Sequence, residues 1–256
     1  MSYIQNNGNN IHQAPLSQDN AEAGNGAQIP SLNSHNNSAN AVAQAATSTA
    51  PLPNAQVLPP AATSAQPPAV SAEGLIEALK NGHIDTVKAA IQGLTTEQRI
   101  DLLKQQDNHG TTGLMWALYN GHTEAFKAAI KGLTTKQRIE LLKQQNNDGI
   151  TGLMAAMSYG HTEAFKVAIE GLTTKQRFEL LKHQNENGTT GLIEAMSNGR
   201  TETVKVAIEG LEPEQRIELI THQDKNGTTG LMWASRNGHD DAVEEIMDLL
   251  RREMQQ

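Results

Sequence analysis

The sequence predicts an all-α protein, a solenoid of stacked helical repeats preceded by a disordered N-terminal tail. One observation is a fixed period, because glycines recur every 39 residues at Gly113, Gly152, Gly191 and Gly230. Another is that apolar positions persist from copy to copy while polar positions vary. A period of about 20–50 residues with this pattern is typical of repeat arrays, whose units shield one another's hydrophobic sides. The third observation is a change in amino-acid composition near residue 72.

Residues 1–72 form the predicted tail and linker. They contain no Lys or Arg, and Asp19 and Glu22 are their only acidic residues. Asn, Gln, Ser and Ala dominate, and a Pro-containing stretch follows over 50–70. Ala buries too little surface to offset the entropy lost when a chain is ordered, so we expect disorder here. The Pro-rich part is expected to form a semi-extended linker.

The repeat array is predicted over residues 73–256. Its units are expected at about 73–106, 107–145, 146–184, 185–223 and 224–256. In the first unit, Ser71 can cap a helix that continues through 75–80 and stops at Gly82. A second amphipathic helix is predicted over 85–92.

A third helix in each unit is predicted to begin with a capping box, first formed by Thr95 and Gln98. In the fourth copy, Pro213 stands at the first helical position, where its missing N–H has no cost. The third helices are expected to run to about Gln106, Gln145, Gln184 and Gln223. A polar turn then ends in a glycine, which adopts positive φ readily. The last copy instead ends in a longer, charged helix, expected to give the array a polar outer face.

These residues resemble the ankyrin repeat. Its pattern D-x-x-G-x-T-P-L-x-x-A, a Gly-His turn and an amphipathic helix match Asp107 to Ala117, Gly121-His122 and Phe126–Ile130. Here T-P-L-H is replaced by T-G-L-M, and the unit is longer by about six residues, which supply the third helix. The resemblance implies a protein-binding array. We expect three-helix units with short turns and little or no strand.

The composition argues against several classes of function. The net charge is −8, and basic residues mostly have acidic neighbours on the same helix, as with Lys143 and Glu140, which disfavours a nucleic-acid partner. The absence of cysteine excludes disulfides, thiolate nucleophiles and cysteine-bound zinc. No apolar run approaches the roughly 20 residues of a membrane span, and no secretory signal peptide is expected. We therefore expect a soluble protein.

Histidines recur at one position of the repeat, with arginine in the fourth copy: His83, His122, His161, Arg200 and His239. Equivalent residues of stacked helices lie about 8–10 Å apart. Two nitrogens on one zinc must lie within about 3.5 Å of each other, so we predict no metal site. His183 and His222 are excluded by the same distance. We expect each repeat histidine to hydrogen-bond the backbone of its own turn.

Other recurring residues also have structural explanations. Core positions by periodicity are Met115, Met154, Met157, Met196 and Met232. The acidic residues of the second helices are expected to face solvent near the helix N-termini, where the helix dipole favours them: Glu124, Glu163, Glu202 and Asp241. No nucleophile, base and orienting group recur together. The sequence therefore predicts neither catalytic residues nor a cofactor.

One set of positions on the first helices varies between units. All Trp and Tyr residues of the repeats fall in it, whereas all three Phe fall at core positions. The resemblance places this set on the concave face, and aromatic and Arg residues dominate binding hot spots. The predicted partner-binding residues are Trp116, Tyr119, Asn120, Tyr159, Glu194, Trp233 and Arg236. The alternative is that Trp116 and Trp233 fill space between helices.

The leading hypothesis is a monomeric, non-catalytic module for protein–protein interaction. A basic-free tail ahead of long ankyrin-like repeats is similar to bacterial effector proteins secreted into host cells. This resemblance implies a narrower hypothesis, a virulence effector that is delivered while its tail is unfolded. The alternatives are an intracellular scaffold without secretion, a self-assembling spacer, or an enzyme with an unrecognised site.

Overall fold

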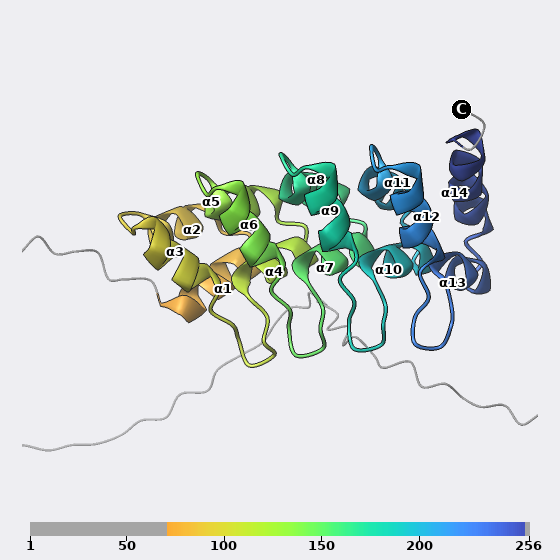
Figure 1. The fold of residues 1–256 in the computed structure, drawn as a ribbon. Helices are drawn as coiled ribbons and strands as arrows, with labels where there is room; N and C mark the ends of the chain where they lie inside the picture. Colours follow the sequence, from red (N-terminus) through yellow and green to blue (C-terminus); the bar gives the residue numbers. More distant parts are fainter. Residues whose placement is uncertain (1–70, 254–256) are drawn as a thin grey trace, which may run out of the picture. The chain divides into compact units, whose positions relative to one another are not determined.

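The computed structural model describes residues 71–253, with side chains as far as Arg251. The predicted disorder of the tail therefore falls almost entirely outside the described residues. Within the described range the fold is all-α, with fourteen helices and four isolated bridges in place of strands. This confirms the predicted helical repeat array. Four units hold three helices each and a fifth holds two (Figure 1).

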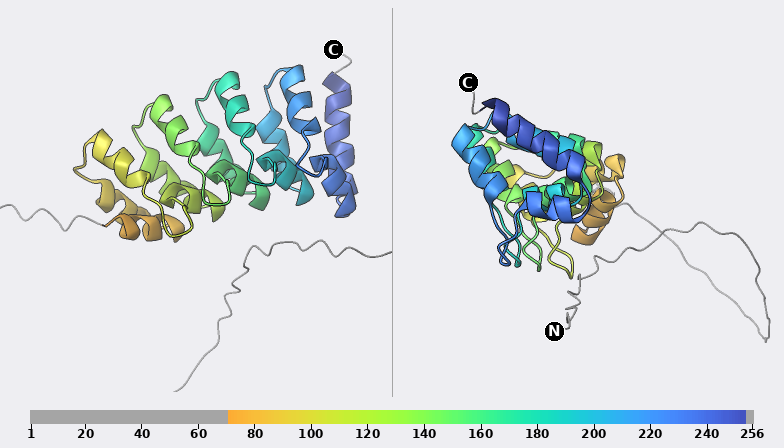
Figure 2. Two further views of the ribbon diagram at one scale, coloured as in Figure 1. Left: turned by 60° about the horizontal axis from the view of Figure 1, so that its bottom comes forward. Right: turned by 90° about the vertical axis from the view of Figure 1, so that its right-hand side faces the viewer.

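The helices fall into three rows (Figures 1 and 2). The first helices of the units are α1 (Ala72–Lys80), α4 (Gly113–Tyr119), α7 (Gly152–Tyr159), α10 (Gly191–Ser197) and α13 (Gly230–Arg236). The second helices are α2 (Ile84–Ile91), α5 (Thr123–Ile130), α8 (Thr162–Ile169), α11 (Thr201–Ile208) and α14 (Asp240–Glu253). The third helices are α3 (Thr96–Leu103), α6 (Thr135–Leu142), α9 (Thr174–Leu181) and α12 (Pro213–Thr221).

The predicted helix starts are confirmed. The Ser71 hydroxyl caps α1 by accepting a hydrogen bond from the Gly74 amide at 3.1 Å. At the start of α3, the Thr95 amide donates to the Gln98 side chain at 2.9 Å, and the Gln98 amide donates to the Thr95 hydroxyl at 3.2 Å. Both bonds satisfy amides that lack partners within the helix. Pro213 opens α12.

The third helices end earlier than predicted, at Leu103, Leu142, Leu181 and Thr221. The reason is that the following glutamine leaves the helix and pairs in an isolated antiparallel bridge, as Gln106 does with Thr112. The connection to the next unit is therefore a hairpin-like finger, and the prediction of short turns is wrong at this place. The four fingers span 104–112, 143–151, 182–190 and 222–229. They project side by side from one edge (Figures 1 and 2).

The core is continuous through the array because every unit packs on the next. First helices contact one another in sequence, α1 with α4, α4 with α7, α7 with α10 and α10 with α13. Phe126, Phe165 and Val204, at one register of the second helices, are completely buried. Burying each such side chain contributes about 1.5–3 kcal/mol. These contacts confirm that neighbouring units cover one another's hydrophobic sides.

The glycine of the T-G-L-M motif is explained by this packing. A Cβ placed on Gly152 would lie 3.2 Å from the Cα of Met115 and 2.8 Å from a methyl of Leu118. The corresponding glycines of α4, α10 and α13 meet the preceding first helix in the same way. Neighbouring first helices thus approach too closely for a side chain at this position.

The fifth unit departs from the prediction of buried methionines. Met115, Met154, Met157 and Met196 are buried, but Met232 is 49% exposed. Ile217 on α12 is 43% exposed as well. Among the described residues no following unit covers either side chain. The C-terminal end is therefore not the uniformly polar surface that the sequence predicted.

Candidate interaction surface on the first helices

Three aromatic side chains connect α4 with α7. The rings of Trp116 and Tyr119 meet edge to face with centroids 5.3 Å apart, and those of Tyr119 and Tyr159 lie 4.5 Å apart. The two tyrosine hydroxyls are 2.8 Å apart and hydrogen-bonded. The Lys80 ammonium of α1 lies 4.7 Å from the centre of the Trp116 ring. An aromatic row thus crosses two units, and a lysine of a third unit lies over one end of it.

The two tryptophans are fixed by their own fingers. The indole N–H of Trp116 donates to the carboxylate of Asp107 at 2.7 Å, and that of Trp233 donates to Asp224 at 2.9 Å. Burial alone would raise the pKa of Asp107, but hydrogen bonds from Trp116 and the finger backbone outweigh it, so the pKa is lowered. Both indoles are partly buried and partly exposed. They fill space against the fingers and still present surface.

The middle units lack this bond because both partners change together. Asn146 replaces the aspartate where Ala155 replaces the tryptophan, and Asn185 does so where Glu194 stands. Each asparagine still accepts two finger backbone N–H groups, as Asn146 does at 3.0 and 2.8 Å. In the second unit, the carboxylate of Asp107 meets the Trp116 indole at this register. An aspartate at 185 would instead place its negative charge beside the carboxylate of Glu194. The neutral asparagine avoids that repulsion.

Glu194 is a half-buried carboxyl on this surface. Burial raises its pKa, and a hydrogen bond with the Ser158 side chain opposes the shift in part. The neighbouring Tyr159 hydroxyl also has a raised pKa, because of burial, the bond with Tyr119 and the nearby charge of Glu194. An ionised carboxylate in this position is short of solvation, so it would gain from a cationic or hydrogen-bond-donating partner.

At the C-terminal side of the surface, the Arg236 guanidinium lies 5.4 Å from the Trp233 ring centre. One of its nitrogens donates to the Thr228 hydroxyl at 3.4 Å. Arg236 is exposed. An exposed cation over an aromatic ring is thus available to a partner.

Asn120 serves the array itself. Its side-chain amide donates to the Lys80 carbonyl at 2.9 Å, joining α4 to the end of α1. Asn198 and Asn237 join their units to the preceding ones in the same way. In the third unit Tyr159 takes this position. Of the seven predicted residues, Arg236 is exposed and the other six are half-buried, and Asn120 also forms this internal bond.

The histidines correct another expectation. His161 hydrogen-bonds the backbone of Tyr119 in the preceding unit rather than that of its own turn. Burial lowers the pKa of His161, the Tyr119 bond opposes this, and the charges of Arg200 and His122 lower it further. The ring lies over Gly121 of the preceding unit. Its position holds two units together.

A row of arginines on the third helices was not predicted from the sequence. Arg99 donates from Nε to the Ala129 carbonyl at 2.9 Å, and Arg138 donates to the Val167 and Ala168 carbonyls at 3.1 Å. Arg177 donates to the Glu209 carbonyl. Each arginine caps the second helix of the next unit, where free carbonyls and the dipole favour a cation. The fixed 39-residue spacing of these arginines was the available signal.

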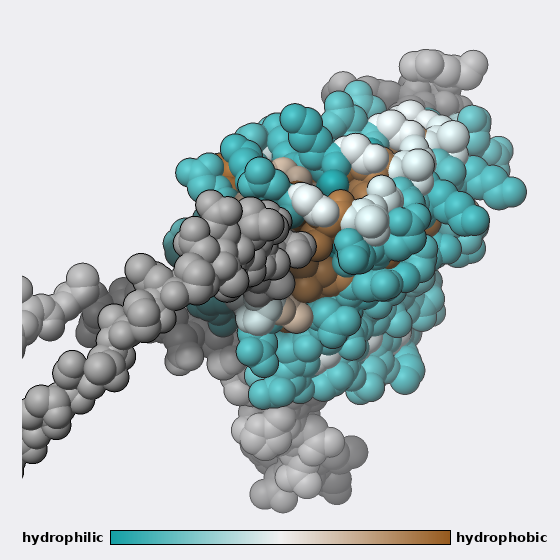
Figure 3. All heavy atoms as spheres, turned by 90° about the vertical axis from the view of Figure 1, so that its left-hand side faces the viewer, coloured by the Kyte–Doolittle hydropathy of each residue, from teal (hydrophilic) through white to brown (hydrophobic). Residues whose placement is uncertain are grey.

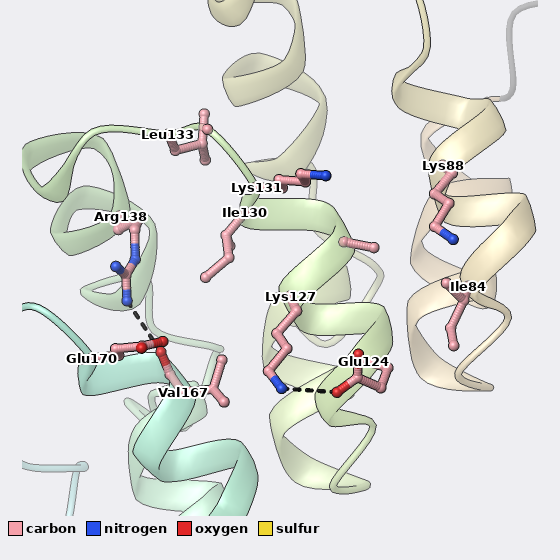
Figure 4. Close-up of a pocket in the computed structure, with 12 residues that line it drawn as sticks. Ile84, Lys88, Glu124, Lys127, Ile130, Lys131, Leu133, Arg138, Val167 and Glu170 are labelled. Atoms are coloured by element: carbon pink, nitrogen blue, oxygen red, sulfur yellow. Dashed lines mark hydrogen bonds and ion pairs between the residues drawn. The ribbon is translucent and has the colours of Figure 1, made fainter.

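The opposite side of the array carries charges of both signs. A cavity of about 480 Å³ lies over α2, α5 and α8, among lysines, glutamates and aliphatic side chains (Figure 4). Lys127 points to Glu124 at 2.9 Å, and Glu124 and Glu163 are solvent-exposed, as predicted. Glu140 pairs with Lys104 of the preceding unit rather than with Lys143. Within residues 71–251, no group of His, Asp and Glu side chains is arranged to hold a metal ion.

The architecture defines a helical repeat protein of stacked three-helix units. The family model described as ankyrin repeats (3 copies) matches residues 128–216 and 175–252. This part of the chain therefore consists of ankyrin repeats, which act as protein–protein interaction modules and are generally non-catalytic. No curated protein matches the chain. None of the helices within 71–253 combines the length and apolarity that crossing a bilayer requires.

Proposed function

We propose that the protein binds a partner protein through its first-helix face. This face consists of Trp116, Tyr119, Tyr159, Glu194, Trp233 and Arg236. The observation that carries the proposal is that every Trp and Tyr of the repeats lies on this one face and retains exposed surface. Ankyrin repeats elsewhere bind proteins, which supports the same conclusion.

The internal bonds of the face favour tight binding. Trp116, Tyr119 and Trp233 are held by hydrogen bonds, so little side-chain entropy remains to be lost on association. Rigid aromatic residues and Arg dominate measured hot spots. Glu194 adds a poorly solvated carboxyl near the middle of the face. The proposed partner surface therefore combines apolar contacts with a donor for Glu194.

The test is partner capture with the full chain. Truncating both Trp116 and Tyr119 would also remove the bond to Asp107, so it confuses binding with stability. The better variant is Tyr119→Ala combined with Arg236→Ala, which keeps both aspartate–tryptophan bonds. Thermal unfolding of this variant measures what the loss of the Tyr119–Tyr159 bond costs. A hot-spot loss of about 2 kcal/mol from one of the two substitutions predicts an affinity about 30-fold weaker, and two additive losses predict about 1,000-fold.

The matched control is Glu124→Ala combined with Glu163→Ala, on the second helices. Each of these residues forms only an exposed ion pair within its helix. Such pairs contribute about 0–1 kcal/mol to stability. Capture that is lost in the control and retained in the first-helix variant would place the binding surface on the other side.

We infer further that the tail delivers the array from a bacterium into a host cell. Support comes from residues 1–72, which carry no Lys or Arg and only two acidic residues. The test fuses residues 1–50 to a translocation reporter in a bacterium with an injection system. Reporter signal in host cells is expected. Its absence would leave the alternative of an intracellular scaffold.

A further inference from the structure

The C-terminal end of the array exposes positions that are covered in earlier units. Met115 and Met154 are 5% and 4% exposed, whereas Met232, at the same register, is 49% exposed. On the third helices, Phe178 is 8% exposed and the equivalent Ile217 is 43% exposed. Array ends need polar outer faces to remain soluble on their own. This end is apolar where a neighbour would pack.

Two glycines show that the other contacts of this interface are open as well. A Cβ on Gly199 would lie 2.8 Å from the His239 ring, but nothing lies within 4 Å of one on Gly238. In the fingers, a Cβ on Gly188 would lie 3.1 Å from the Lys225 amide. On Gly227 the nearest atom is a side chain of the same finger. At these positions, within the part of the chain that the structure describes, the accepting side of a unit-to-unit interface is uncovered.

The N-terminal unit carries the complementary half. Gly74, Asn81 and His83 occupy the registers of Gly113, Asn120 and His122, which contact the preceding unit. Asn81 and His83 are exposed. Figure 3 shows hydrophobic side chains gathered at the centre of this end within a hydrophilic rim. Partly exposed hydrophobic residues of this unit include Ile84 and Ile91.

One pair of positions at the two ends is also complementary in charge. One register of the second helices holds lysine in four units, at Lys88, Lys127, Lys166 and Lys205, and glutamate only in the fifth, at Glu244. The next residue, Glu245, already pairs with Lys205 of the preceding unit. A first unit stacked on α14 would bring its Lys88 next to Glu244. Opposite charges at this contact favour the stacking.

We propose that copies of this protein stack end to end, with the first unit of one copy on the fifth unit of another. Gly74 then packs on Met232, the His83 ring lies over Gly238, and the Asn81 amide donates to the Arg236 carbonyl. Each contact repeats one that already joins units within the chain. Because the two surfaces differ, the contact is heterologous and extends into open chains of copies. The proposal replaces the expected monomer and is independent of the partner proposed above.

The test is sedimentation of the full chain over a range of concentrations. The single chain has a mass of 27.6 kDa. The average mass of the wild type is expected to rise with concentration beyond that of a dimer. Met232→Glu blocks one end and Gly74→Arg blocks the other, so each variant alone is expected to remain monomeric. An equal mixture of the two variants keeps one intact interface and is expected to form a species of two chains.

Met232 is exposed, so thermal unfolding of dilute Met232→Glu is expected to be unchanged. Gly74 is half-buried, so unfolding of Gly74→Arg is measured in the same way. His83→Glu is a second way to block the N-terminal end if Gly74→Arg alters folding. A wild type that stays monomeric up to its solubility limit would overturn the proposal. So would a wild type that stops at a dimer, or a mixture of the two blocked variants that does not associate.

Discussion

At the scale of single residues, the aspartate–tryptophan pairs show how a binding surface is built into the fold. Sequence reasoning identified Trp116 and Trp233 from their register but not their bonds to Asp107 and Asp224, which lie nine residues away. The signal was present in the copies, since aspartate occurs only where tryptophan follows. This co-occurrence of aspartate and tryptophan is visible only when the units are compared with one another.

Asp107→Asn is expected to lower the free energy of unfolding by about 1 kcal/mol, because a charged hydrogen bond to Trp116 becomes a neutral one. Denaturant titration measures this loss. Asn146→Asp is the matched control, because Ala155 offers no donor there, and no gain is expected. If Asn146→Asp raised the free energy of unfolding by as much as Asp107→Asn lowers it, the indole bond would not be the cause.

This stabilisation is also expected to depend on pH. The pKa of Asp107 is depressed in the folded state from its ordinary value of 3.8. Its contribution is therefore present above that value and lost as the pH falls through the folded pKa. The difference in stability between the wild type and Asp107→Asn should shrink in that acidic range. A constant difference there would contradict this explanation.

Glu194 is expected to show the opposite pH dependence. Burial raises its folded pKa above the ordinary value of 4.5, so stability is greatest below that value and is lost as the pH rises through the folded pKa. Glu194→Gln should therefore raise the denaturant midpoint at neutral pH. The gain should fade in acid.

If Glu194 serves binding, the same variant should capture the partner more weakly, by about 1 kcal/mol or more. Glu202→Gln, an exposed carboxyl on α11 away from the first-helix face, is the control. A variant that is more stable and binds equally well would remove Glu194 from the proposed face. Binding sites often keep residues that lower the stability of the fold because function needs them.

At the scale of helices, sequence patterns predicted starts better than ends. Capping residues bond to amides that are close in sequence, so Thr95 and Gln98 predict the start of α3 directly. The ends depend on contacts with other parts of the chain. Gln106 leaves the helix because it pairs with Thr112 in the finger, which helical periodicity does not reveal.

Arg138→Gln tests the bonds between third and second helices. The substitution removes a cation that donates to two carbonyls at the end of α8, with an expected loss of about 1.5–3 kcal/mol. Hydrogen exchange should accelerate at the C-terminal turn of α8, although the substituted residue lies on α6. Arg251→Gln, which loses only an exposed ion pair within α14, should change little. Faster exchange confined to α6 would contradict a bond between units.

At the scale of the whole molecule, periodicity predicts the interior of an array and not its ends. It placed Phe126 and Phe165 in the core correctly because each has neighbours on both sides. It placed Met232 there wrongly because register alone does not show whether a neighbour follows. The same limit applies to function, since a repeated shape specifies a surface for binding without its partner.

Photo-crosslinking from chosen positions of the full chain tests the first-helix face most directly. A crosslinking amino acid placed at Tyr119 or Arg236 is expected to capture one common partner. The same group at Glu163 or Glu202, on the second helices, is expected to capture none. Adducts formed from the second-helix positions alone would contradict the proposed binding face.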